Sequence, residues 1–156
     1  MHKTTSATPH LLDSIYVVVA DHCCARFFTA AVPEAPLVEL KSLANPQLHQ
    51  HEGGLVTDHA GSFNSGTRRG GHTAGHDNTT RHHFSERFAS EICKELAAAR
   101  IGGRCTRIHV IAEPGFLGLL RHELDEPTRR LVASELSKDV VRSLPAEIRE
   151  LLPARL

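Results

Sequence analysis

The stretch IYVVVA, residues 15–20, decides the fold class. It is β-branched and almost entirely apolar, which is typical of a strand that is buried on both faces of its sheet. Two further apolar runs follow after short connectors: ARFFTAAV (25–32) and PLVELKSLA (36–44). Short polar or proline-bearing connectors between apolar runs indicate an antiparallel meander. The first part of the chain is therefore predicted to form three strands, and Pro46 ends the last of them.

The second half of the chain predicts helices that alternate with strands. One apolar stripe recurs every fourth residue: Phe84, Phe88, Ile92 and Leu96. A helix is expected from about Thr80, with Thr79 or Thr80 as its cap, to Gly102. The later elements are expected to be a strand at 106–112, a helix at 113–124 closed by Pro127, a strand at 130–137 and a helix at 143–152. The fold predicted is α/β, a three-layer mixed sheet in the ribonuclease H-like order β-β-β-α-β-α-β-α, with a long loop before the first helix.

Length and composition indicate a single α/β domain over 15–156, preceded by a flexible tail at 1–14. Hydrophobic residues make up 40% of the 156 residues and charged residues 23%, as in globular proteins. Eighteen Lys and Arg balance eighteen Asp and Glu, so any polyanion would have to meet a local basic patch. The four cysteines show no C-x-x-C spacing, and reduced thiols in a cytoplasmic protein are expected. Neither membrane insertion nor a secretory signal is predicted.

Residues 46–80 carry no sustained apolar period, and a loop of this length in a compact domain is commonly functional or disordered. Its basic part continues into the helix as GTRRGGHTAGHDNTTRHHFSE (66–86). Glycines let backbone amides approach an anion closely, and arginines bind phosphates in bidentate fashion. The residues expected to contact such a ligand are Arg68, Arg69, Gly70, Gly71, His72 and Arg81. A solvated loop without a ligand is the alternative interpretation.

Histidines in the same segment raise the question of a metal site. His72 and His76 are the pair considered, with Asp58 and Asp77 close in sequence. Zinc needs three or four ligands fixed by ordered elements, and no H-E-x-x-H or C-x-x-C framework is present. No functional metal and no other cofactor are therefore expected, and adventitious metal uptake stays as the alternative.

Several phrases together resemble one bacterial family, the small proteins required for attachment to host cells (host attachment proteins). The phrases are VVVADHCCARFF (17–28), Asn45–Pro46, LVTDHAGSF (55–63), FLGLLR (116–121), Lys138–Asp139 and LPAEIRELLP (144–153). The family is held to be related to the middle domain of archaeal and eukaryotic peptide-chain release factors. This kinship implies the element order that the periodicity predicts independently, and it implies no established reaction.

The resemblance to release factors also concerns the segment at 68–72. In those proteins a Gly-Gly-Gln tip lies in the long loop before the first helix and enters the peptidyl-transferase centre of the ribosome. The equivalent place here holds the sequence Arg68-Arg69-Gly70-Gly71-His72. The basic, glycine-bearing tip is similar, and the glutamine is absent. The resemblance therefore implies contact with RNA or the ribosome, and does not imply the chemistry of translation termination.

A hydrolase is the alternative that the expected fold suggests. Ribonuclease H-like enzymes hold two Mg²⁺ ions between carboxylates from the first strand, the first helix and the fourth strand. Asp21 ends the first predicted strand and Glu113 the fourth, so the two meet at one sheet edge if those strands pair. Glu86 and Glu91 lie off the apolar stripe of the helix and are expected to face away. His22 and its cysteine neighbours are too close in sequence to form a catalytic pair on a strand.

These observations predict a non-enzymatic binding module that contacts RNA, the ribosome or another polyanion through residues 53–83. A metal-dependent hydrolase or nuclease and a protein–protein adaptor are the alternatives. The oligomeric state is left open.

Overall fold

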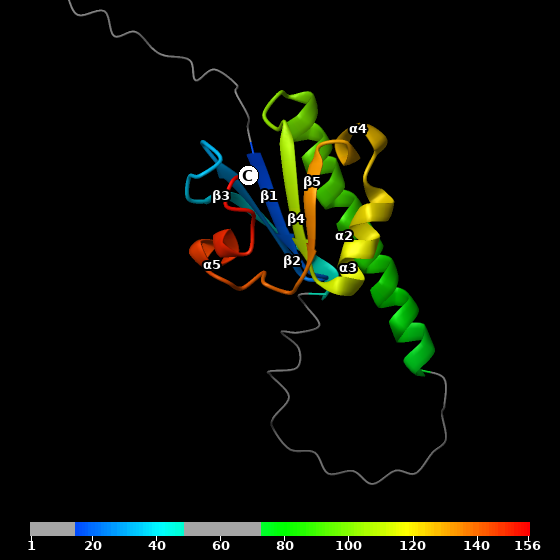
Figure 1. Ribbon diagram of the computed structural model, residues 1–156. Helices are drawn as coiled ribbons and strands as arrows, with labels where there is room; N and C mark the ends of the chain where they lie inside the picture. Colours follow the sequence, from blue (N-terminus) through cyan, green and yellow to red (C-terminus); the bar gives the residue numbers. More distant parts are fainter. Residues whose placement is uncertain (1–14, 49–72) are drawn as a thin grey trace, which may run out of the picture.

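Five strands form one mixed sheet in the order β3-β2-β1-β4-β5 (Figure 1). The computed structural model describes residues 15–48 and 73–156. The strands are Ile15–Ala20 (β1), Cys24–Ala30 (β2), Val38–Ala44 (β3), Arg107–Ala112 (β4) and Val132–Ser137 (β5). β1 pairs antiparallel with β2, and β2 pairs antiparallel with β3, which gives the predicted meander. β1 and β5 both run parallel to β4.

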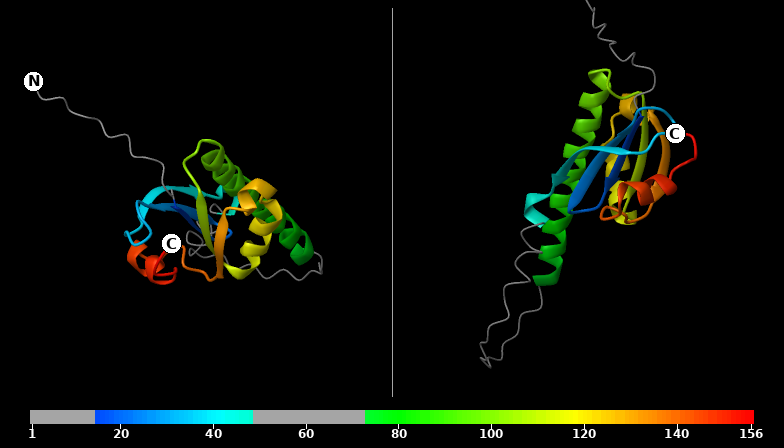
Figure 2. Two further views of the ribbon diagram at one scale, coloured as in Figure 1. Left: turned by 45° about the horizontal axis from the view of Figure 1, so that its top comes forward. Right: turned by 90° about the vertical axis from the view of Figure 1, so that its left-hand side faces the viewer.

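Helices cover both faces of this sheet, as the predicted α/β fold requires. They are Thr73–Ile101 (α2), Pro114–Glu123 (α3), Glu126–Arg129 (α4) and Pro145–Glu150 (α5). Figure 1 and the views of Figure 2 show α2, α3 and α4 on one side of the sheet and α5 on the other. No described helix is long and apolar enough to cross a bilayer.

β1 is buried on both faces, as its composition predicts. Val18 and Ala20 belong to the apolar cluster under α2 and α3, together with Phe88 of the predicted stripe. Val17 and Val19, which point to the opposite face, belong to the cluster that includes residues of α5. Parallel strand pairs such as β1 and β4 occur almost only in sheets that are covered on both faces. Burial on both faces therefore explains both the apolar sequence of β1 and its central position in the sheet.

The first helix begins earlier than the sequence prediction placed it. α2 starts at Thr73 instead of near Thr80, so Thr79 and Thr80 lie inside the helix and do not cap it. Helix propagation is cooperative, and the single Gly75 costs only about 1 kcal/mol relative to alanine. The predicted loop at 46–80 is thus helical at 73–80 and also at 46–48. Residues 49–72 and the predicted tail at 1–14 lie outside the described residues.

Pro127 begins a short helix instead of closing one. α3 ends at Glu123, and α4 follows with Pro127 in its first turn and Asp125 as its cap. The Asp125 carboxylate accepts a hydrogen bond from the Thr128 amide at 3.0 Å. Proline is favoured in the first turn because its missing N–H has no partner there anyway. This additional helix and the helical residues 46–48 are the departures of the described elements from the predicted order.

Candidate functional site

A pocket of about 470 Å³ opens at the carboxyl ends of β1 and β4. The chain leaves β1 toward β2 and leaves β4 toward α3, so the two neighbouring strands connect in opposite directions. Ligands of open α/β sheets bind outside such a switch point. The side chains that line the pocket include Asp21, His22, Arg81, Ser85, Glu113 and Asp139. This pocket is the candidate site.

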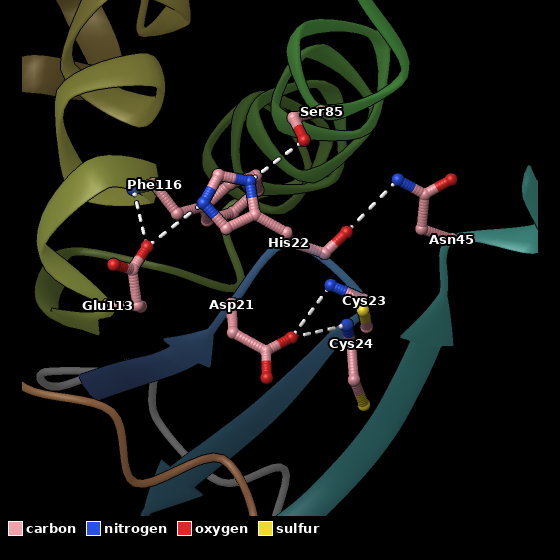
Figure 3. Close-up of polar contacts among 8 residues, drawn as sticks. All are labelled: Asp21, His22, Cys23, Cys24, Asn45, Ser85, Glu113 and Phe116. Atoms are coloured by element: carbon pink, nitrogen blue, oxygen red, sulfur yellow. Dashed lines mark hydrogen bonds and ion pairs between the residues drawn. The ribbon is translucent and has the colours of Figure 1, made fainter. Parts of the chain in front are cut away.

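His22 lies between a hydroxyl and a carboxylate that come from two other elements (Figure 3). Its Nδ1 is 2.8 Å from Oγ of Ser85 on α2. Its Nε2 is 3.0 Å from Oε2 of Glu113, which precedes α3. The imidazole ring forms a T-shaped contact with Phe116, with 5.2 Å between the ring centroids. Both ring nitrogens and the ring itself are therefore held in place.

The turn after β1 explains why His22 projects into the pocket. Oδ1 of Asp21 accepts hydrogen bonds from the amides of Cys23 and Cys24, at 2.8 and 2.7 Å. An aspartate that binds the backbone amides of the following residues closes a tight turn without a glycine. Figure 3 shows the Asp21 carboxylate directed at these amides. Asp21 therefore shapes the turn that presents His22.

Glu113 has two roles in the site. Its carboxylate caps α3 by accepting a hydrogen bond from the Phe116 amide at 3.0 Å. Burial acts to raise the pKa of Glu113, but the amides of Gly115 and Phe116 together with His22 outweigh it and hold the pKa below its usual value. Glu113 is therefore ionised at neutral pH, and it can only accept hydrogen bonds.

Asn45 holds the turn after β1, which carries His22, against α2. Its side chain is buried, with the residue 1% exposed. The amide donates to the carbonyl of His22 at 3.0 Å and to the carbonyl of Phe84 at 3.2 Å. Because Phe84 precedes Ser85, this one amide holds the backbones of both partners of the His22–Ser85 hydrogen bond.

Two of the predicted site residues meet as the strand pairing requires. Ala20 pairs with Ala112, so Asp21 and Glu113 follow directly at the carboxyl-terminal ends of β1 and β4 and line the same pocket. Arg81, predicted as a phosphate contact, is exposed and lines this pocket from α2. The structure therefore gathers residues from two separate predictions around one pocket.

The remaining predicted residues do not join this group. Glu86 forms an exposed ion pair with His82 at 3.2 Å, and Glu91 is exposed. Arg68, Arg69, Gly70, Gly71 and His72 lie outside the described residues, and only the backbone of His76 is described. Within residues 15–48 and 73–156, no group of three or more His, Cys, Asp or Glu side chains is arranged to hold a metal ion.

Ser85 and Asn45 were not singled out as site residues from the sequence. Ser85 lies three and four positions before Phe88 and Ala89, so it falls on the buried side of α2 and is 3% exposed. A hydroxyl on a buried helical face needs a hydrogen-bond partner. The position of Ser85 on the buried helical face therefore indicates that it has a partner. The sequence does not identify that partner, because His22 is 63 residues away.

Comparison with solved structures finds similarity to two longer archaeal proteins. An archaeal translation termination factor matches with a TM-score of 0.50 and 12% identity, over 90% of this chain and 35% of that one. A structure described as an archaeal protein matches with a TM-score of 0.46 and 13% identity, over 88% of this chain and 33% of that one. The chain thus spans about a third of the length of either structure.

Sequence comparison identifies the family. No curated protein sequence matches this chain. The profile of one family, described as "Protein required for attachment to host cells", matches residues 16–152. It covers all five described strands except the first residue of β1. The chain belongs to this host attachment family.

Proposed function

We propose that the chain binds RNA, in the ribosome or free, through residues 53–83 and the adjoining turn of α2 as far as Arg87. The observation that carries the proposal is a set of exposed basic side chains on the first half of α2. Arg81 and Arg87 are exposed, and no side chain that the structure describes forms an ion pair with either of them. His83, one helical turn before Arg87, is also exposed. Exposed arginines can bind phosphate groups through two parallel hydrogen bonds.

The sequence that leads into α2 is also basic. Arg68 and Arg69 precede the helix by a few residues, and Gly70 and Gly71 follow them. The solved structure that shares the fold at a TM-score of 0.50 is named as a translation termination factor, which supports an RNA partner over other polyanions. Phosphate contact by the loop and by α2 would then form one continuous surface.

The acidic pocket limits where a polyanion can lie. Asp21, Glu113 and Asp139 line it, so a phosphate backbone inside the pocket would meet three carboxylates. The proposed RNA surface is therefore the outer side of α2 together with residues 66–72, and Arg81 marks its border with the pocket.

Co-sedimentation with ribosomes and binding to single-stranded RNA test this proposal. The double variants Arg68→Ala/Arg69→Ala and Arg81→Ala/Arg87→Ala should each weaken RNA binding about tenfold or more and reduce the slope of log K against log salt by roughly two. Arg130→Ala/Arg155→Ala removes the same charge from residues that already pair with Glu126 and Glu34. This control should leave both quantities unchanged.

Other outcomes would favour the alternatives from the sequence. Equal weakening by all three double variants would indicate nonspecific attraction and contradict the proposed surface. Ribosome association that persists in high salt and without these arginines would indicate a protein partner. Cleavage of the RNA probe that depends on Mg²⁺ or Mn²⁺ and is lost in Asp21→Asn would indicate a hydrolase.

A further inference from the structure

The hydrogen bonds around His22 define which of its nitrogens carries the proton. The ionised carboxylate of Glu113 accepts only, so the contact of 3.0 Å places the proton on Nε2. In the neutral imidazole Nδ1 then carries the lone pair and accepts the hydroxyl proton of Ser85 at 2.8 Å. The three groups form one chain of hydrogen bonds that runs from carboxylate through imidazole to hydroxyl.

This order of groups is the one that activates a serine. A base that accepts the hydroxyl proton makes the oxygen nucleophilic, and a carboxylate on the other ring nitrogen orients the base and stabilises its protonated form. Such a constellation is recognised by geometry and roles on unrelated folds, not by the order of residues in the chain. Here the imidazole uses Nδ1 toward the serine and Nε2 toward the acid.

The surroundings hold this arrangement rigid. Asn45 binds the carbonyls of His22 and Phe84, so the backbones that carry the base and the serine are joined by one buried amide. Phe116 packs against the imidazole ring in a T-shaped arrangement. Two hydrogen bonds and a ring contact leave the imidazole little freedom to turn away, which is the pre-organisation that catalysis requires.

The pocket gives the serine access to a small ligand. Ser85 lines the cavity of about 470 Å³, which is within the usual range for small-molecule sites. Leu48 adds an apolar wall that is 2% exposed. Arg81 lies one helical turn before Ser85 on α2 and lines the same cavity. A guanidinium in this place suits the negative charge that develops on a carbonyl oxygen under attack.

We infer that the pocket hydrolyses small carboxylic esters, with Ser85 as the nucleophile, His22 as the general base and Arg81 at the carbonyl oxygen. Oγ of Ser85 forms a bond to the carbonyl carbon while its proton moves to Nδ1 of His22. The tetrahedral intermediate then breaks its bond to the leaving alcohol, which takes the proton from His22. Water then attacks the acyl carbon while its proton moves to Nδ1 of His22. The bond to Oγ of Ser85 breaks, Oγ takes that proton, and the carboxylic acid is released. Glu113 is a positioning residue throughout.

A second Ser–His pair in the same sheet lacks the acid. Nδ1 of His109 on β4 lies 2.6 Å from Oγ of Ser134 on β5. Nε2 of His109 is buried, and no partner for it lies among the described residues. This pair shares the hydroxyl–imidazole contact, but no described carboxylate binds the second ring nitrogen, and neither residue lines the candidate pocket. It serves as an internal control for reactivity.

Labelling of the full-length protein with a fluorophosphonate, followed by peptide mass spectrometry, tests the nucleophile. The reagent transfers its phosphonyl group to an activated serine and loses fluoride. We expect one adduct on the peptide that contains Ser85 and none on the peptide that contains Ser134. Hydrolysis of p-nitrophenyl acetate and butyrate should fall about 100-fold or more in Ser85→Ala and in His22→Gln. In Glu113→Gln the pH profile of the remaining rate should also shift, which a merely structural role would not produce.

Ser85→Cys provides a measurement that does not depend on ester turnover. Cys93 lies on the same helix, and burial raises its pKa to about 12. A thiol at position 85 that contacts His22 should instead alkylate with iodoacetamide with a midpoint below about pH 7.5, as thiols beside a histidine do. A midpoint at or above that of an ordinary thiol, about 8.5, would overturn the inference. So would a folded wild-type protein without an adduct on Ser85, or equal ester hydrolysis by wild type and Ser85→Ala. Loss of esterase activity with RNA binding intact would separate this site from the proposed RNA surface.

Discussion

Replacing Asn45 with alanine removes the amide that joins the turn after β1 to α2. The side chain donates two hydrogen bonds, to the carbonyls of His22 and Phe84, and no water can replace it easily because the residue is 1% exposed. Alanine leaves both carbonyls without this donor. The variant therefore tests whether one buried amide stabilises the contact between the turn after β1 and α2, where the pocket lies.

The expected loss follows from the number of bonds. Leaving a buried hydrogen-bonding group without its partner costs about 1–3 kcal/mol, and both carbonyls lie in partly buried surroundings, so we take the lower part of that range for each. The free energy of unfolding of Asn45→Ala should fall by about 2–3 kcal/mol. With an m value of about 2 kcal/mol/M, the urea midpoint should fall by roughly 1–1.5 M. Asn45→Asp should lose more, because a carboxylate has no donor and repels both carbonyl oxygens.

Urea unfolding followed by circular dichroism at neutral pH measures these differences. Gln47→Ala is the matched control, because Gln47 is exposed two positions away, and its unfolding free energy should stay within about 0.5 kcal/mol of wild type. If Asn45→Ala also stays within that margin, the two hydrogen bonds do not stabilise the fold and the reasoning is refuted. If Asn45→Asp is as stable as wild type, the amide is not acting as a donor.

Three further predictions concern other parts of the molecule. Burial and two nearby arginines lower the pKa of His109 in the folded protein. The free energy of unfolding should therefore be highest above the unfolded pKa of about 6.5 and decline as the pH falls below it. Urea unfolding at several pH values should show a weaker dependence of this free energy on pH for His109→Gln. Burial raises the pKa of Cys93 to about 12 and that of Cys105 to about 11, so a disulfide reagent should modify neither in the folded protein and both after unfolding, while equal reaction in the two states would contradict their burial. Arg26 binds Glu39 through two nitrogens and also donates to two carbonyls, so Arg26→Lys should lower the unfolding free energy by about 1–2 kcal/mol, measured against Arg130→Lys as the exposed control.

The strands and the buried side of α2 could be predicted because short-range patterns determine them. A β-branched apolar run such as residues 15–20 has few places other than the centre of a covered sheet. The spacing of Phe84, Phe88, Ile92 and Leu96 predicts that they share one buried face of a helix. Three of them are buried, and Phe84 is partly buried. The sequence predicts that Asp21 and Glu113 lie close together if the two strands that they follow pair, and the parallel pairing of β1 with β4 meets that condition.

The contacts of His22 could not be predicted, because they depend on the exact register of three elements. Ser85 and Glu113 are far from His22 in sequence and approach it only after α2 and α3 have packed on the sheet. The start of α2 was misplaced for a related reason. Local signals such as a threonine cap are weak beside the cooperativity of a helix of 29 residues. Pro127 was ambiguous in the same way, because a proline can stand in the first turn of a helix as well as just after its end.

The parallel pairing of β1 with β4 has a consequence for biosynthesis. Ile15 lies beside Arg107, so the strand that is made first has to wait for most of the polypeptide before it gains its second neighbour. Until residues 107–112 leave the ribosome tunnel, β1 keeps one open edge and the apolar side of α2 lacks much of the surface that it covers. Nascent chains that stall before this point are therefore expected to depend on chaperones and to be degraded readily, and release of the completed C-terminal part should end both effects within the folding time of a small domain.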